Sequence, residues 1–294
     1  MFPPDMALLA AERALAAAAT PASELTLLVF TSVHRHGHRP YWSVTSWLQD
    51  RLGCRQATPM AVSQGCNGQM LMLQVAASLL RGQGGGTALV VAADRFSASG
   101  FERFTADYDI LFGDGGAAAV LTLEGDGHRT RQRPCWHVLG AHTVSAPELE
   151  ALHRDASPCA ATPETTADDH DIRAVKRRFV TEHGKDIISK RTRQAVGEIR
   201  EVLLPSGYDL RLRHIAYPHL GRRLLEENYF PELPPTADRT LRTFGSEVGH
   251  LGSGDQIAGL DHIARTGGTV PGDRVLLLGA GAGFTWTGML LERI

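Results

Sequence analysis

The stretch AVSQGCNGQMLMLQVAASLL, residues 61–80, places one cysteine directly before a long apolar run. Gly65 precedes Cys66 and Gly68 follows it closely, and the run behind them has the length and composition of a buried helix. A helix N-terminus offers unpaired N–H groups and a partial positive charge, and both favour a thiolate over a thiol. These residues alone leave two interpretations open for Cys66: a small buried apolar side chain, or a nucleophile.

Bulk composition excludes several classes of protein. The chain has 294 residues, 43% of them apolar and 21% charged, so one large or two similar globular domains are expected. A formal net charge of -2 gives no argument for binding nucleic acid or a membrane surface. The sequence shows neither a secretory leader nor an apolar run long enough to span a membrane, so we expect a cytoplasmic protein.

The sequence gives no pattern typical of a metal site. Its four cysteines, at positions 54, 66, 135 and 159, form no CxxC pair, and reduced thiols are expected. Three histidines alternate at positions 34, 36 and 38, but no carboxylate or cysteine joins them, so a solvated loop is the expected structure. We also expect the polar segment 155–171 to be an exposed loop.

Helical stretches alternate with short apolar runs, which predicts an α/β fold. We predict helices at 5–18, 41–53, about 68–81, about 188–203 and after residue 254, and strands at 24–32, 87–96, 112–125, 213–217 and within 272–294.

The order of the segments repeats along the chain. Thr26 and Ile215 stand 189 positions apart, and Ala88 and Val275 stand 187 apart. We therefore expect two similar halves, 1–145 and 146–294, packed as one compact unit about a pseudo-twofold axis. The larger offset makes Asp255 the counterpart of Cys66 and places both in one buried centre. A coincidental self-alignment of an α/β chain is the alternative.

Five motifs, read together, resemble the ketoacyl-ACP synthase III branch of the thiolase superfamily. They are CNGQMLMLQVAASLL (66–80), ALVVAADRFS (88–97), FGDGGAAAVL (112–121), PHLG (218–221) and PGDRVLLLGAGAGFTW (271–286). The resemblance implies a thiolase-like five-layered αβαβα sandwich, a homodimer, no cofactor, and a nucleophilic cysteine at a buried helix N-terminus, which is Cys66 here. The stretch before Cys66 is shorter than in that family, which implies that the family's N-terminal strand and part of its substrate tunnel are missing.

The resemblance also implies partners for Cys66. His219 stands where the family has its catalytic histidine, and His250 stands where the family has an asparagine that hydrogen-bonds a thioester carbonyl. Asp255 follows five residues later. An ionised aspartate only accepts hydrogen bonds and repels a forming enolate, but beside a histidine it raises the basicity of the ring. We therefore expect Asp255 to orient His219 as general base, with His250 as a further site residue; a plain helix N-cap is the alternative for Asp255.

A Cys-His-Asp set suits acyl transfer to a hydroxyl or amine better than decarboxylative condensation. It resembles the acyltransferases of this family from bacterial secondary metabolism, the makers of antibiotics and polyketides, which share the GHLGSGDQ style of turn (249–256). The predicted function is transfer of an acyl group from an acyl carrier protein or CoA thioester, through Cys66, to a natural-product intermediate. Two alternatives stay open: condensation with malonyl-ACP, as in fatty acid biosynthesis, and an inactive partner that gates the choice of starter unit.

Two further sets of site residues are expected. The backbone N–H groups of Cys66 and Ala282 would form the oxyanion site, because the Gly-rich turn 279–283 occupies the family's position for it. Arg222 and Arg223, just after His219, would meet an acidic carrier protein or the phosphates of CoA.

Overall fold

The structure is a computed structural model, and it describes residues 1–34, 36–39, 41–97, 101–123, 135–154, 171–205, 211–234 and 241–294. The expected loop at 155–171, with Cys159, lies almost wholly outside these residues. Within them the strands form two four-stranded sheets, with the orders β2-β1-β3-β4 and β5-β8-β7-β6. The strands are β1 (Leu27–Thr31), β2 (Thr58–Val62), β3 (Thr87–Asp94), β4 (Gly115–Thr122), β5 (Trp136–Ser145), β6 (Leu212–Ala216), β7 (Arg274–Gly281) and β8 (Thr285–Arg293).

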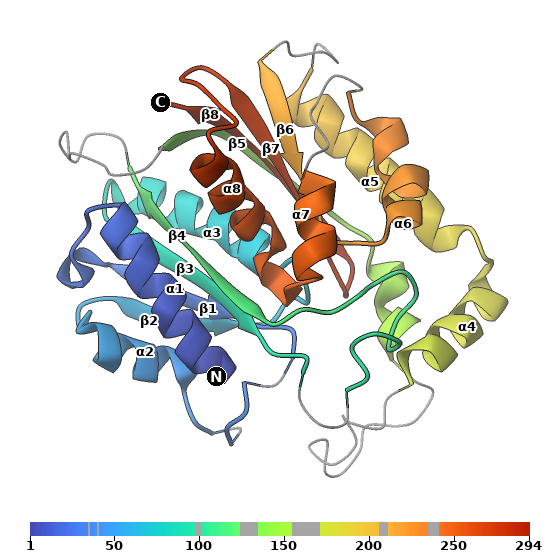
Figure 1. Ribbon diagram of the computed structural model, residues 1–294, viewed down its shortest axis with the longest axis horizontal. Helices are drawn as coiled ribbons and strands as arrows, with labels where there is room; N and C mark the ends of the chain where they lie inside the picture. The colour runs from blue at the N-terminus through green and yellow to red at the C-terminus, as the bar shows by residue number, and fades with distance from the viewer. Residues whose placement is uncertain are drawn as a thin grey trace.

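Helices make the other three layers, as Figure 1 shows. The helices are α1 (Pro3–Ala17), α2 (Val44–Leu52), α3 (Gly68–Gln83), α4 (Ile172–His183), α5 (Ile187–Leu203), α6 (Arg222–Asn228), α7 (Leu241–Val248) and α8 (Asp255–Thr266). Helices α1 and α2 cover the outer face of the first sheet, and α5 and α6 cover the outer face of the second. Helices α3 and α8 lie between the two sheets, so the five predicted layers are present.

Side chains point alternately to the two faces of each central strand, and they contribute in this way to three hydrophobic cores. In β1, Leu27 and Val29 face the central helices, whereas Leu28 and Phe30 face α1 and α2. Strand β7 alternates in the same way between the central core and the outer core under α5. A strand buried on both faces reads as a continuous apolar run because no position faces water, and this explains why both strands were predictable.

An inner strand of the first sheet, β1, has a hydrogen-bonded neighbour on each side. Strand β1 pairs in parallel with β2 on one side and with β3 on the other, and β3 pairs antiparallel with β4. Strand β2 was not predicted: it is short, it carries Pro59, and its residues lie at an exposed edge, where a proline is tolerated.

The two sheets divide the chain close to the expected boundary at 145/146. Strand β5 was not predicted; its residues fall within the expected first half, but it pairs with β8 in the second sheet. The change of sheet therefore falls between β4 and β5. Helices α4, α6 and α7 were also not predicted, and α7 ends shortly before the turn that carries His250.

The two central helices begin in the same way. The residues before them, Asn67 and Gly254, have φ/ψ of -90°/-1° and -90°/-5°. Each helix has a buried glutamine as its second residue: Gln69 donates to carbonyls of β3 and β4, and Gln256 donates to the carbonyl of Leu278 in β7. The glutamines stand 187 positions apart, the offset that also relates Ala88 and Val275. Asp255 is therefore not the counterpart of Cys66 in this repeat; that position is Ser253.

Candidate active site

Cys66 lies in a tight turn two residues before the start of α3. Gly65 adopts φ +52°, and a Cβ atom on it would lie 2.8 Å from the backbone nitrogen of Ala282. Gly68 lies so close to β1 that a Cβ atom would come within 2.1 Å of the Thr31 hydroxyl oxygen. The two glycines flanking the cysteine therefore let the turn pack between β1 and the β7–β8 connection.

A buried amide fixes this turn to the second sheet. The Asn67 Nδ2 group donates to the hydroxyl oxygens of Thr285 and Thr287 on β8, both at 2.9 Å. Asn67 is fully buried, so these two bonds satisfy a group that water does not reach. The position of the neighbouring Cys66 thus depends on the second half of the molecule.

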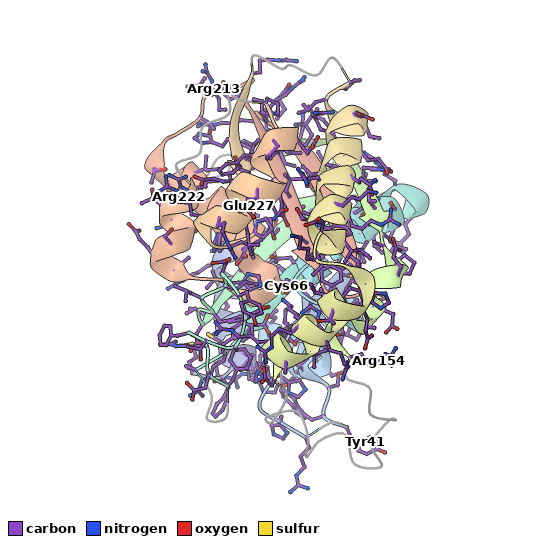
Figure 2. All side chains as sticks on the ribbon, turned by 90° about the vertical axis from the view of Figure 1, so that its right-hand side faces the viewer. Tyr41, Cys66, Arg154, Arg213, Arg222 and Glu227 are labelled. Carbon is purple, nitrogen blue, oxygen red and sulfur yellow. The ribbon has the colours of Figure 1, made fainter. Side chains whose placement is uncertain are left out.

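Cys66, His250 and Asp255 form a connected series. The Cys66 Sγ atom lies 2.9 Å from His250 Nε2, and His250 Nδ1 lies 2.6 Å from Asp255 Oδ2. His250 and Asp255 are almost completely buried, whereas Cys66 is only half-buried. Figure 2 shows Cys66 near the middle of one face of the molecule, between Arg222 and Arg154. This is the order of contacts that an acyl-transfer triad requires: nucleophile, base, carboxylate.

Backbone bonds hold the histidine and the aspartate. The N–H of His250 donates to the Leu111 carbonyl at 2.7 Å, and the His250 carbonyl accepts from the N–H of Gly113 at 2.9 Å. The Asp255 carboxylate accepts from the backbone N–H groups of Leu251 and His219, each at 2.7 Å. Because Asp255 is also the first residue of α8, the positive end of that helix favours its ionised form.

Electrostatics favours a charged histidine beside the thiol. Burial alone would lower the pKa of His250, but Asp255 and Cys66 raise that pKa well above its ordinary value. Burial alone would likewise raise the pKa of Asp255, but His219 and His250 hold it below the usual range. An imidazolium at hydrogen-bond distance from sulfur stabilises a thiolate, which is the reactive form of cysteine.

The structure places His219 differently from the general base expected from the sequence. Its Nδ1 atom lies 2.8 Å from the Gly249 carbonyl oxygen and 3.3 Å from Asp255 Oδ1. Asp255 therefore contacts both histidines, but the ring at hydrogen-bond distance from Cys66 Sγ is that of His250. The physical reason is the turn at residues 249–254, which brings His250 within hydrogen-bond distance of both Asp255 and Cys66.

The expected oxyanion residues lie side by side. The Gly65 contact described above brings Ala282 against the cysteine turn, and Gly281 packs equally closely on Asn67. The backbones of Cys66 and Ala282 therefore lie next to each other, as two donors to one carbonyl oxygen near the sulfur require.

The two expected carrier-binding arginines are exposed at the start of α6. Arg222 pairs with Glu226 one turn along the helix, and Arg223 pairs with Asp109 at 2.7 Å. The carbonyl of Asp109 also accepts from Gly221, so this residue joins the loop before β4 to the start of α6. Figure 2 shows Arg222 on the same face of the molecule as Cys66.

Aromatic residues that were not predicted from the sequence shape the site through packing. Phe112 lies against the His250 ring, with centroids 5.6 Å apart, and Phe96 and Phe101 pack on Phe112. Phe112 was noticed only as part of the motif FGDGGAAAVL. Asp114 in that motif accepts from the backbone N–H groups of Phe96 and Ser97 and so ties two loops together. No sequence pattern links Phe112 and its aromatic neighbours to His250, which lies more than 130 positions later.

Within the described residues, no cluster of histidine, cysteine, aspartate or glutamate has the arrangement of a metal site. None of the described helices is long and apolar enough to cross a membrane. The alternating histidines lie beside aromatic residues instead: the His34 ring packs on Phe96, and the His38 ring stacks on Trp42.

Comparisons with known proteins agree with this geometry. The model of a family described as 3-oxoacyl-[acyl-carrier-protein (ACP)] synthase III matches residues 60–133, and the model of its C-terminal part matches residues 212–293, together more than half of the chain. The acetoacetyl CoA synthase NphT7 of Streptomyces sp. (strain CL190) is 30% identical over 98% of this chain and 83% of its own length. A beta-ketoacyl-[acyl-carrier-protein] synthase III of Rhizorhabdus wittichii is 27% identical over 94% of this chain and 80% of its own length. The solved structure of ChlB3, an acyltransferase, superposes with a TM-score of 0.83 at 30% identity, covering 99% of this chain and 84% of ChlB3. These similarities confirm the predicted thiolase-like fold.

Proposed function

We propose a reaction from the premise that this chain belongs to the 3-oxoacyl-[acyl-carrier-protein] synthase III family and is a transferring or condensing enzyme of that family. The reaction is acyl transfer from an acyl carrier protein or CoA thioester, through Cys66, to a hydroxyl or amine of a small natural product. One observation carries this proposal: His250 links Cys66 to an ionised aspartate, at 2.9 Å on one side and 2.6 Å on the other.

The first half-reaction loads the enzyme. The Cys66 thiolate attacks the thioester carbonyl, and its oxygen takes the negative charge against the backbone N–H groups of Cys66 and Ala282. A new bond forms between the carbonyl carbon and Cys66 as the bond to the donor sulfur breaks. The departing thiolate takes the proton of the His250 imidazolium, so the free thiol leaves and His250 becomes neutral.

The second half-reaction transfers the acyl group. Neutral His250 removes the proton from the acceptor hydroxyl or amine as that group attacks the acyl-Cys66 carbonyl. The bond to the Cys66 sulfur breaks, and the thiolate returns beside the newly formed imidazolium. Asp255 stays ionised throughout and accepts the hydrogen bond of His250 Nδ1–H. This bond keeps the other ring nitrogen of His250, Nε2, directed at the sulfur. In this scheme His250 is the general base, and His219 helps to hold Asp255.

Condensation with malonyl-ACP is the second candidate, and the family relatives favour it. A condensing site needs donors that hold an enolate oxygen, and a protonated His250 is one such donor. Asp255 weighs against this reaction, because a carboxylate directly behind the histidine favours proton removal over enolate stabilisation. The intact contact between Cys66 and His250 also weighs against an inactive partner.

Intact-protein mass spectrometry tests the proposal. The wild type and Cys66→Ala are incubated with a panel of acyl-CoA and acyl-carrier donors that includes malonyl thioesters. We expect an acyl adduct on the wild type alone, and a malonyl adduct that keeps its carboxylate. Loss of carbon dioxide from the malonyl donor would favour condensation, and the absence of any adduct would overturn the covalent mechanism.

The homodimer implied by the resemblance is also a proposal, and one surface supports it. Strand β2 is an edge of the first sheet, its sequence TPMAV (58–62) carries no charge, and every residue except Pro59 keeps a backbone N–H for pairing with another strand. Light scattering of the purified chain would give twice the 31.8 kDa chain mass for a dimer.

A further inference from the structure

Asp94 is a buried carboxylate that the proposed mechanism does not use. It is the last residue of β3, follows an apolar run, and is 0% exposed. Its recorded partners among the described residues are backbone N–H groups: Oδ1 accepts from Val33 at 2.7 Å and from His34 at 2.8 Å, and Oδ2 accepts from Ser253 at a long 3.4 Å. Aspartate is rarely buried without a basic partner because the ion loses its hydration.

The other oxygen of Asp94 lies directly against the turn that joins the two catalytic groups. Gly252 adopts φ +66°, and a Cβ atom on it would come within 2.0 Å of Asp94 Oδ2. Gly252 and Ser253 stand between His250 and Asp255 in the sequence. The carboxylate therefore contacts the short connection that sets how the histidine lies relative to the aspartate.

The charge of Asp94 also faces the site. Burial raises the pKa of Asp94 to about 7, although the three N–H donors and the charge of His250 act in the opposite direction. His250 is its charged neighbour on the side of the turn, and His34 is the titratable residue on the side of β1. A carboxylate here favours the imidazolium form of His250, although it is costly to bury.

We propose that Asp94 is a positioning residue, which clamps the Gly252–Ser253 turn to the end of β1 and so holds His250 and Asp255 in line with Cys66. It touches no reacting atom and acts through the turn. The inference rests on the proposed roles of Cys66, His250 and Asp255. It is tested with a neutral alkylating agent, so that its outcome does not depend on which acyl donor the enzyme accepts.

The main variant is Asp94→Asn, which keeps the size of the side chain but removes its charge and places an NH2 group at one of the two oxygen positions. Its matched control is Asp273→Asn. Asp273 is also a buried carboxylate that accepts a backbone N–H, from Val270, and it pairs with Arg213. Figure 2 shows Arg213 at the edge of the molecule, far from Cys66.

The readouts are the alkylation rate of Cys66 by iodoacetamide, followed on the Cys66 peptide, and the melting temperature at pH 6 and pH 8. We expect Asp94→Asn to slow alkylation by roughly 10- to 100-fold, as a small misplacement of reacting groups does, while Asp273→Asn stays within about twofold of the wild type. Because the anion at position 94 is the costly form, the melting temperature of Asp94→Asn relative to the wild type should rise from pH 6 to pH 8.

A second pair of variants approaches the clamp from its other side. Gly252→Ala pushes a methyl group into Asp94, whereas Gly267→Ala imposes the same backbone strain, at φ +71°, with no atom within 4 Å of the new Cβ. We expect only Gly252→Ala to slow alkylation. Wild-type alkylation in both Asp94→Asn and Gly252→Ala would overturn the proposal, and so would an equal slowing in the variants and their controls. If Asp94→Asn does not fold, the glycine pair decides alone.

Discussion

The turn before α3 and the turn before α8 end with nearly the same backbone conformation, but they carry side chains of different chemistry. Each precedes a buried helix whose second residue is a glutamine that donates to strand carbonyls. The first turn presents a half-buried thiol. The second turn buries a histidine, and the helix that follows it opens with a carboxylate. The repeat thus supplies two helix N-termini that meet at one centre, and only the first is left open to an external reactant.

The largest expected effect comes from removing the base that the second turn supplies. His250→Ala should slow acylation of Cys66 and transfer from it by roughly 10³-fold, the size of effect typical of general acid–base catalysis. His219→Ala, which removes a ring bonded to Gly249 and Asp255, should cost no more than about tenfold. Single-turnover acylation measured by mass spectrometry separates the two. The reverse ranking would return the role of base to His219.

Removing the charge behind the base should have a smaller effect and a distinctive pH dependence. Asp255→Asn should slow acyl transfer by roughly 10²-fold. Asp255 raises the pKa of His250, so the variant histidine loses its proton at a lower pH, and the alkaline limb of the rate profile should move to lower pH.

The control is Asp261→Asn, on the same helix, where the exposed carboxylate pairs with Arg265. It should leave both the rate and the profile unchanged. An unshifted alkaline limb in Asp255→Asn would show that the carboxylate does not set the proton affinity of the base.

The two buried glutamines, Gln69 and Gln256, provide a comparison of how much equivalent side chains of the two halves contribute to the free energy of unfolding. Gln69 donates to the carbonyls of Val90 and Ala117, whereas Gln256 donates to that of Leu278 alone. Gln69→Leu should therefore cost about 1–3 kcal/mol in unfolding free energy, and Gln256→Leu about 1 kcal/mol, as measured by urea denaturation. Equal losses would mean that the second carbonyl contact of Gln69 adds nothing.

The smallest expected effect concerns the surface beside the open turn. Arg222→Glu combined with Arg223→Glu should raise KM for an acyl carrier protein by roughly threefold to tenfold, and by less at high salt. A short pantetheine thioester should be used equally well by the variant and the wild type. Arg265→Glu, on α8, provides the control for a reversal of charge elsewhere on the surface. An unchanged KM with the carrier protein would remove these arginines from the docking surface.

Much of the fold could be predicted because its central strands are buried on both faces. The runs at Leu27–Thr31 and Arg274–Gly281 are almost wholly apolar, and no other element fits such short stretches. Strand β2 escaped prediction because an exposed edge needs no apolar run. Strand β5 was also missed, and the boundary at 145/146 left its residues in the first half, since sequence order does not reveal that they pair with β8.

The candidate site was predictable as a set of residues but not as an arrangement. The motifs brought Cys66, His219, His250 and Asp255 together. Choosing the histidine that meets the thiol required the path of the turn after Gly249, which backbone bonds to Leu111 and Gly113 determine. Such long-range backbone pairing leaves no trace in local composition.

The hydrogen bonds from Asn67 to Thr285 and Thr287 have a consequence for folding during translation. The turn that carries Cys66 and Asn67 is translated well before the anchors of Asn67 on β8 and before His250 and Asp255. Because domains begin to fold during synthesis from the N-terminal side, the nascent first half would hold Cys66 without its partner His250. Cys66 therefore gains its contact with His250 only after the turn before α8 has been made and folded.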